Sequence, residues 1–125
     1  EEAIDPLGVP RSLYTNPEVA SFGLSKEEAE KAGYDVLVEQ LPFSYNGRAI
    51  AIGETEGYVK LISEKQYHLL LGAVIVGPNG TDLLQNLILL RQAEATLDQV
   101  LETVFAHPTT SELIQEVAKR LVQDD

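Results

Sequence analysis

The 125-residue chain carries 9 lysines and arginines against 20 aspartates and glutamates, a formal net charge of −11 that argues against binding to a nucleic-acid backbone. Hydrophobic residues make up 44% of the sequence, which is ordinary for a globular protein and sufficient for one domain with its own core. No apolar run approaches the roughly 20 residues that a membrane helix needs, so we expect no membrane contact.

Two residue types are missing from the chain. The absence of cysteine excludes disulfide bonds, thiolate-bound metals and a redox-active dithiol of its own, and we expect no metal site. The chain also lacks methionine and begins Glu1-Glu2, and an initiator methionine is rarely removed before so bulky a residue. We therefore expect a piece of a longer protein, located in the cytoplasm, or in the mitochondrial matrix if its source is eukaryotic.

The N-terminal half predicts mainly strands. Residues 1–10 contain two prolines and a glycine and are predicted to be a linker, so the domain is expected to span residues 11–123. The capping-box pattern Ser25-Lys26-Glu27-Glu28 predicts a helix that ends at Gly33, and Asn46-Gly47 is a turn signal. The predicted strands are Arg11–Tyr14, Val19–Gly23, Tyr34–Phe43, Tyr58–Ser63 and Leu69–Val76, of which the last is nearly all apolar and expected at the centre of a sheet.

The C-terminal half predicts helices over Asp82–Glu94, Leu97–Phe105 and Ser111–Val122. The second of these has the apolar spacing i, i+3, i+4, i+7, i+8 that is typical of an amphipathic helix. The first carries Leu89 and Leu90 off its main apolar stripe, so this helix is buried either within the domain or, as we favour, at a subunit interface. Strands followed by helices predict an α+β fold, an antiparallel sheet with helices packed on one face.

The segment Phe105-Ala106-His107-Pro108-Thr109-Thr110-Ser111-Glu112 is the strongest functional signal in the chain. Imidazole is the side chain whose ordinary pKa lies near neutrality, and a carboxylate can orient it as a general base. The rest of the chain offers no partner for such a base, so we expect half of an active site. Glu112 has a second reading that stays open, because in a capping box its carboxylate accepts the Thr109 N–H.

Other candidate positions have plainer interpretations. His68 lies in a polar turn without a partner at ligand spacing and is expected to be solvated. Gly77-Pro78-Asn79-Gly80 lacks the spacing and the lysine of a phosphate-binding loop, which favours a simple turn. Arg48 is expected to be a structural arginine at the surface.

Several segments, in this order, resemble the C-terminal dimerisation domain of FAD-dependent pyridine-nucleotide disulfide oxidoreductases. They are Tyr14-Thr15-Asn16-Pro17-Glu18-Val19-Ala20, Pro42-Phe43, Asn46-Gly47-Arg48-Ala49, Gly57-Tyr58-Val59-Lys60-Leu61-Ile62, Leu71-Gly72-Ala73, Val76-Gly77-Pro78, and His107-Pro108-Thr109 with Ser111-Glu112. The first of these segments is similar to the opening motif of that domain, the last is similar to its signature, and those between them are similar to its middle strands. The Asn-Gly-Arg-Ala stretch most resembles dihydrolipoamide dehydrogenase, the E3 component of 2-oxo-acid dehydrogenase complexes.

The resemblance implies a homodimer in which His107 reaches the flavin site of the partner subunit. There His107 would remove a proton from a dihydrolipoamide thiol, Glu112 would hold the ring, and electrons would pass from a dithiol to FAD and on to NAD. The backbone carbonyl of His107 would accept a hydrogen bond from the flavin, and the bond to Pro108 is expected to be cis. Docking of the basic peripheral-subunit-binding domain of an acyltransferase (E2) is also implied.

The sequence departs from the family pattern at Phe105, where many members have a second histidine. The FAD and NAD domains and the paired cysteines are absent from the chain, so the isolated chain is expected to be inactive and to bind neither cofactor. Two alternatives remain: a stand-alone dimerisation or adaptor module without catalysis, and the same domain from a glutathione or mercuric reductase. The C-terminal Val122-Gln123-Asp124-Asp125 lacks the cysteine pair expected of mercuric reductase.

Overall fold

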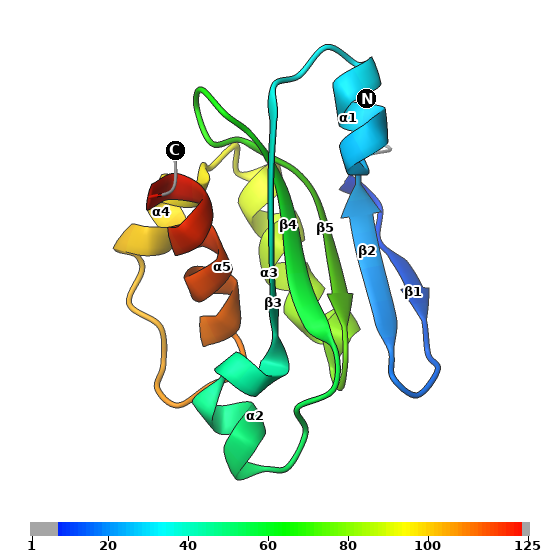
Figure 1. Cartoon of the computed structure of the whole chain (residues 1–125), viewed down its shortest axis with the longest axis vertical. Coiled ribbons are helices and arrows are strands. Elements are labelled where there is room, and N and C mark those ends of the chain that lie inside the picture. Colours follow the sequence, from blue (N-terminus) through cyan, green and yellow to red (C-terminus); the bar gives the residue numbers. More distant parts are fainter. Residues whose placement is uncertain (1–7, 124–125) are drawn as a thin grey trace.

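The computed structural model describes residues 8–123, which form a five-stranded antiparallel sheet with helices (Figure 1). The strands are β1 (Arg11–Leu13), β2 (Val19–Gly23), β3 (Val36–Pro42), β4 (Tyr58–Glu64) and β5 (Leu70–Val76), in the spatial order β1-β2-β5-β4-β3. The predicted α+β class is confirmed, and the apolar strand β5 is the central one, as its composition predicts. Most of the linker predicted for residues 1–10 lies outside the described residues.

Within residues 8–123, helical segments accompany the sheet. They are α1 (Lys26–Lys31), the 3-10 turn η2 (Phe43–Tyr45), α2 (Gly47–Ala51), α3 (Gly80–Gln92), α4 (Leu97–Glu102) and α5 (Glu112–Gln123). The turn predicted at Asn46-Gly47 is wrong, because Asn46 is the N-cap of α2 and accepts the Ala49 N–H through its side chain. None of the helices within residues 8–123 has the length and apolar character to cross a membrane.

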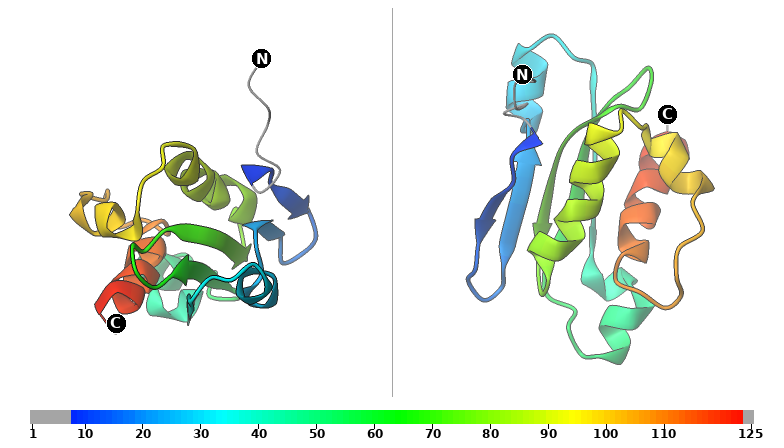
Figure 2. Two further views of the ribbon diagram at one scale, coloured as in Figure 1. Left: turned by 90° about the horizontal axis from the view of Figure 1, so that it is seen from above. Right: turned by 180° about the vertical axis from the view of Figure 1, so that it is seen from behind.

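The main core lies between one face of the sheet and the pair α3 and α5. Helix α3 lies along β2 and β5, and α5 lies along β3 and β4, so that the two helices are side by side over the sheet (Figure 2). Leu84 and Leu87 of α3, Leu113 and Val117 of α5, and Leu61 of β4 are all almost completely buried in this layer. Burial of each such side chain stabilises the fold by about 1.5–3 kcal/mol.

A smaller apolar cluster lies on the opposite face, under α1. It consists of the buried residues Ala29, Ile62 and Leu71, with Val36 and Val38 packed against them. A β-bulge between β4 and β5 makes this possible, because the pairing shifts from Ile62↔Gly72 to Ser63↔Leu70 and leaves Leu71 as the extra residue. The capping box predicted at the start of α1 is confirmed, with hydrogen bonds between Ser25 and Glu28 in both directions.

The turn before α3 is held by Glu18, which directly precedes the neighbouring strand β2 at the same end of the sheet. Glu18 Oε1 accepts the Thr81 N–H at 3.2 Å, and the Glu18 carbonyl accepts the Gly77 N–H at 2.8 Å. The N-cap residue Asn79 makes no side-chain capping bond, so Glu18 takes over that function from 63 positions away. The segment at residues 77–80 is therefore a structural turn, as predicted.

His68 is not the solvated residue that its polar turn predicts. Its side chain is 14% exposed, and Nδ1 lies 2.9 Å from Oδ2 of Asp98 in α4. The His68 carbonyl also accepts the Leu97 N–H at 3.0 Å. Two hydrogen bonds thus join the β4–β5 turn to α4, and the imidazole is largely buried.

Candidate functional site

The segment that carries His107 connects α4 to α5. Helix α4 ends at Glu102 and not at Phe105 as its apolar spacing predicts, and the Val104 side chain is 95% exposed. A side chain of α5 contacts this end of the helix, where Gln115 Nε2 donates to the carbonyls of Val100 at 3.1 Å and Thr103 at 2.9 Å. This amide satisfies C-terminal carbonyls that would otherwise favour another helical turn.

The structure brings the three predicted site residues together. Nδ1 of His107 lies 3.1 Å from Oε1 and 3.0 Å from Oε2 of Glu112, and the His107–Pro108 peptide bond is cis, as expected. The His107 side chain is 80% exposed, whereas that of Glu112 is 28% exposed. The imidazole is therefore held by a carboxylate on one side and presented to the outside of the domain on the other.

Glu112 performs both of the roles that the sequence left as alternatives. Its Oε1 atom accepts the Thr109 N–H at 2.8 Å, as in a capping box, while the same carboxylate contacts His107. Both interactions favour the charged carboxylate. The hydrogen bond with His107 is the largest cause that lowers the pKa of Glu112, and the hydrogen bond from the Thr109 backbone is the next. Burial opposes them, and the charge of the imidazole adds a lesser lowering effect.

We expect the stability of this chain to fall in acid partly through Glu112. Its pKa is lower in the folded chain than in the unfolded chain, so the folded state binds fewer protons and stability is lost as the pH falls through these values. Glu112→Gln should reduce the loss between pH 6 and about pH 3, measured by urea denaturation. A residual slope should remain from Glu28, whose pKa is lowered by hydrogen bonds from Ser25.

The control for this measurement is Glu102→Gln, the same change at an exposed position at the end of α4. It should keep the wild-type slope. Equal slopes for Glu112→Gln and wild type would show that the carboxylate gains nothing from His107 and Thr109.

The geometry defines what His107 can do. A carboxylate at Nδ1 fixes the proton of the neutral ring on that nitrogen and leaves Nε2 with its lone pair as an acceptor. No nucleophilic thiol is available within the chain. The site can thus accept a proton from a group brought by another molecule or another subunit.

Sequence reasoning missed Asn46 as a contributor to this site. This residue is 5% exposed, and its Nδ2 donates to the Thr109 carbonyl at 3.0 Å while its Oδ1 accepts the Ala49 N–H at 2.9 Å. The signal that was available is the pair Asn46-Gly47, which we interpreted as a turn. The contact with Thr109 spans 63 positions, and no local pattern encodes it.

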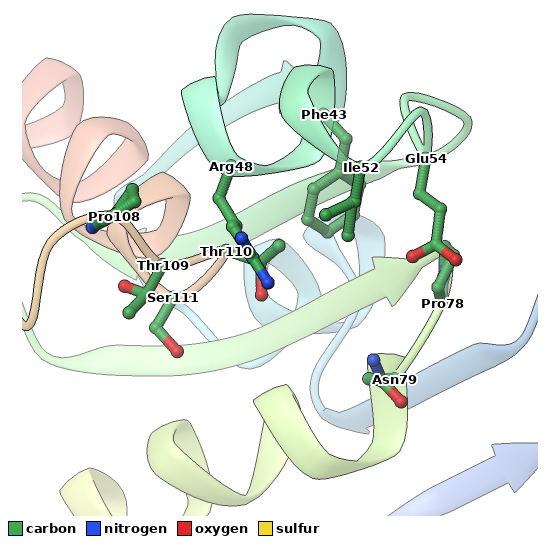
Figure 3. Close-up of a pocket in the computed structure, with 10 residues that line it drawn as sticks. All are labelled: Phe43, Arg48, Ile52, Glu54, Pro78, Asn79, Pro108, Thr109, Thr110 and Ser111. Atoms are coloured by element: carbon green, nitrogen blue, oxygen red, sulfur yellow. The ribbon is translucent and has the colours of Figure 1, made fainter.

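Two of the hollows beside the His107 segment share Arg48 as a lining residue. One, of about 490 Å³, lies between α2, the start of α3 and the start of α5, and is lined among others by Arg48, Glu54 and Thr110 (Figure 3). The other, of about 180 Å³, is lined by His107, Glu112 and Tyr45, and also by Arg48. Arg48 is exposed, as predicted. Within residues 8–123 no cluster of three or more His, Cys, Asp or Glu side chains is arranged to hold a metal ion.

The sequence matches known proteins over nearly its whole length. The model of the pyridine nucleotide-disulphide oxidoreductase dimerisation domain matches residues 9–118. The dihydrolipoyl dehydrogenase of Geobacillus stearothermophilus is 37% identical over 117 residues, which are 94% of this chain and 25% of that protein. The dihydrolipoyl dehydrogenase of Rhizobium etli is 43% identical over 108 residues, 86% of this chain and 22% of that protein.

Solved structures agree with the fold. LpdA from Mycobacterium tuberculosis superposes with a TM-score of 0.88 and 25% identity over 96% of this chain and 26% of that one. The HOCl-induced flavoprotein disulfide reductase RclA from Escherichia coli gives a TM-score of 0.84 at 24% identity over 89% of this chain and 26% of that one, a likeness of fold. The chain spans about a quarter of the length of the curated relatives it matches.

Proposed function

We propose that this chain, which belongs to the pyridine nucleotide-disulphide oxidoreductase family as its dimerisation domain, supplies the general base of a dihydrolipoyl dehydrogenase. The observation that carries the proposal is the His107–Glu112 pair, in which a carboxylate holds Nδ1 and the ring is 80% exposed. The reaction would convert dihydrolipoamide and NAD⁺ to lipoamide, NADH and a proton.

The role of His107 follows from thiol chemistry. Only a thiolate attacks a disulfide, and an ordinary thiol is mostly protonated at neutral pH. Nε2 of His107 would take the proton of one dihydrolipoamide thiol, and Glu112 would stabilise the imidazolium that forms. The protonated ring would later return the proton to solvent or to a departing thiolate.

In the full-length protein, bound FAD would supply the chemistry of two-electron transfer between an enzyme dithiol and NAD. Among the hydrogen bonds of residues 8–123, none ends on the carbonyl of His107, which fits an acceptor for a flavin N–H. Pro108 follows this carbonyl directly and would lie against the same group. The chain itself would hold the flavin of the partner subunit only at this edge.

A homodimer would bring His107 to a partner's flavin site. Two exposed apolar residues support such an interface. Leu89 of α3 is 60% exposed, and Val104 is 95% exposed. Between α3, α4 and α5 lies a hollow of about 350 Å³ that Leu90 and Phe105 help to line. We therefore propose that the dimer interface lies on the α3 side of the domain.

The net charge of −11 supports a second partner. We infer that this partner is the basic binding domain of an E2 acyltransferase.

Location follows from this assignment. A dihydrolipoyl dehydrogenase would work beside its 2-oxo-acid dehydrogenase complex, in the cytoplasm or in the mitochondrial matrix of a eukaryote. The alternative of a non-catalytic adaptor gives no reason for the His107–Glu112 contact. The glutathione reductase and mercuric reductase alternatives differ from the proposed enzyme only in the disulfide or metal ion that is reduced.

A subunit-mixing experiment tests the proposal. One full-length subunit carries His107→Gln and the other lacks its redox cysteines, so neither homodimer is active. Random mixing makes about half of the dimers mixed, each with one intact site, so about a quarter of wild-type activity should return. Recovery depends on mixing before assembly. If His107 served its own subunit, the mixture would stay inactive. One site of each mixed dimer would then lack the histidine, and the other site would lack the redox cysteines.

A further inference from the structure

We propose that Asn46 is a positioning residue for His107, acting through the Thr109 peptide and Glu112. The inference rests on the proposed role of His107 as a base. It concerns a side chain on a different part of the chain, at the start of α2, whose amide reaches the segment between α4 and α5.

Asn46 is one of three buried polar or charged residues in the described part of the chain, the others being Ser63 and Glu64. A buried amide is costly unless its donor and acceptor are both satisfied. Both are: the acceptor binds the Ala49 N–H of its own helix, and the donor binds the Thr109 carbonyl. Capping α2 needs only the acceptor, so the donor has a separate function.

That function is to fix the Thr109 peptide. The Thr109 carbonyl is held by Asn46, its N–H donates to Glu112 Oε1 at 2.8 Å, and its hydroxyl donates to the Ala106 carbonyl at 2.8 Å. Oε1 of Glu112 is shared between this N–H and Nδ1 of His107. The position of Glu112 against the imidazole therefore depends on where Asn46 holds Thr109.

Two substitutions separate this function from helix capping. Asn46→Asp keeps an oxygen acceptor for the Ala49 N–H but replaces the donor with a charged oxygen facing the Thr109 carbonyl. Asn46→Ser also keeps a capping oxygen but is too short to reach Thr109. Asn86→Asp is the matched control, because it makes the same chemical change on α3, where the Asn86 amide donates only to the Leu83 carbonyl at 3.2 Å.

The measurement is the tautomer of the His107 ring in this chain, obtained from the ¹⁵N chemical shifts of its two nitrogens at a pH where the ring is neutral. In the unmodified protein we expect the proton on Nδ1. Both Asn46 variants should lower the ratio of the Nδ1–H to the Nε2–H form by about 5-fold, the equivalent of one hydrogen bond. The Asn86 control should keep the wild-type ratio.

An unchanged ratio in both Asn46 variants, with amide spectra that show a folded domain, would overturn the inference. If the variants do not fold, hydrogen exchange of the Asn46 side-chain amide in the unmodified protein decides. Exchange as fast as that of an exposed asparagine would overturn it, and strong protection would support it. A full-length His107→Gln enzyme that keeps its activity would refute the catalytic proposal and leave this tautomer result standing, so the two failures are distinguishable.

Discussion

In a full-length dihydrolipoyl dehydrogenase that carries this domain, His107→Gln is expected to lower kcat/KM for dihydrolipoamide by about 10²- to 10⁴-fold. Glutamine has a similar reach and can accept a hydrogen bond, but it does not take up a proton at neutral pH. The dihydrolipoamide thiol would then depend on water or buffer to ionise. The loss should fall on kcat/KM, because the proton is transferred in the transition state.

The other histidine of the chain, His68, provides the matched control. His68→Gln makes the same change in the β4–β5 turn, where the imidazole pairs with Asp98 and takes no part in the site. It should keep kcat/KM near that of the wild type. A second readout, the reduction by NADH of an artificial electron acceptor, needs no thiol deprotonation and should survive in both variants. Near-normal lipoamide turnover in His107→Gln would refute the general-base role.

The local parts of the fold are predictable from the sequence because their determinants lie close together in it. The α1 capping box links Ser25 and Glu28, three positions apart, and both hydrogen bonds are present. The apolar run of β5 places it at the centre of the sheet, since a strand with neighbours on both sides and helices on one face has little contact with water. The cis bond at His107 follows from the family resemblance.

The parts that were not predictable depend on contacts between distant segments. Helix α4 ends at Glu102, where Gln115 of α5 donates to the carbonyls of Val100 and of the C-cap Thr103, and the apolar pattern of residues 97–105 contains no sign of this contact. His68 is sheltered by Asp98, 30 positions later. The double role of Glu112 depends on angles and distances that spacing alone does not give, since both readings require only that it lie near the start of α5.

Asn46 shows the same limit within the site itself. The sequence Asn-Gly is compatible with a tight turn and with a helix N-cap, because both use the side-chain oxygen to accept a nearby N–H. In the folded chain the oxygen accepts the Ala49 N–H as an N-cap, and the amide nitrogen has a distant partner, the Thr109 carbonyl. This partner exists only once α2 and the His107 segment are packed together.

The largest effect on stability is expected at Gly57, just before β4. Its φ is +92°, and a Cβ atom there would lie 1.8 Å from the carbonyl oxygen of Val76, at the end of β5. The carbonyl of Val76 belongs to the backbone and not to a flexible side chain, so the backbone itself must move. Gly57→Ala is expected to lower the free energy of unfolding by about 3–5 kcal/mol, combining the strain of a positive φ with overpacking.

Gly33 separates these two contributions. Its φ of +95° is nearly the same, but a Cβ atom there would meet nothing within 4 Å. Gly33→Ala should therefore carry only the conformational strain, about 1–2 kcal/mol, in the same urea denaturation experiment. Equal losses in the two variants would show that β5 gives way to the added methyl group.

The substitution at Gly57 also has an expected local consequence, because the Gly57 carbonyl accepts the Phe43 N–H at 3.1 Å. Displacing Gly57 should thus disturb η2 and the Asn46 cap behind it, so that exchange of the Ala49 amide rises in Gly57→Ala and stays at its wild-type rate in Gly33→Ala.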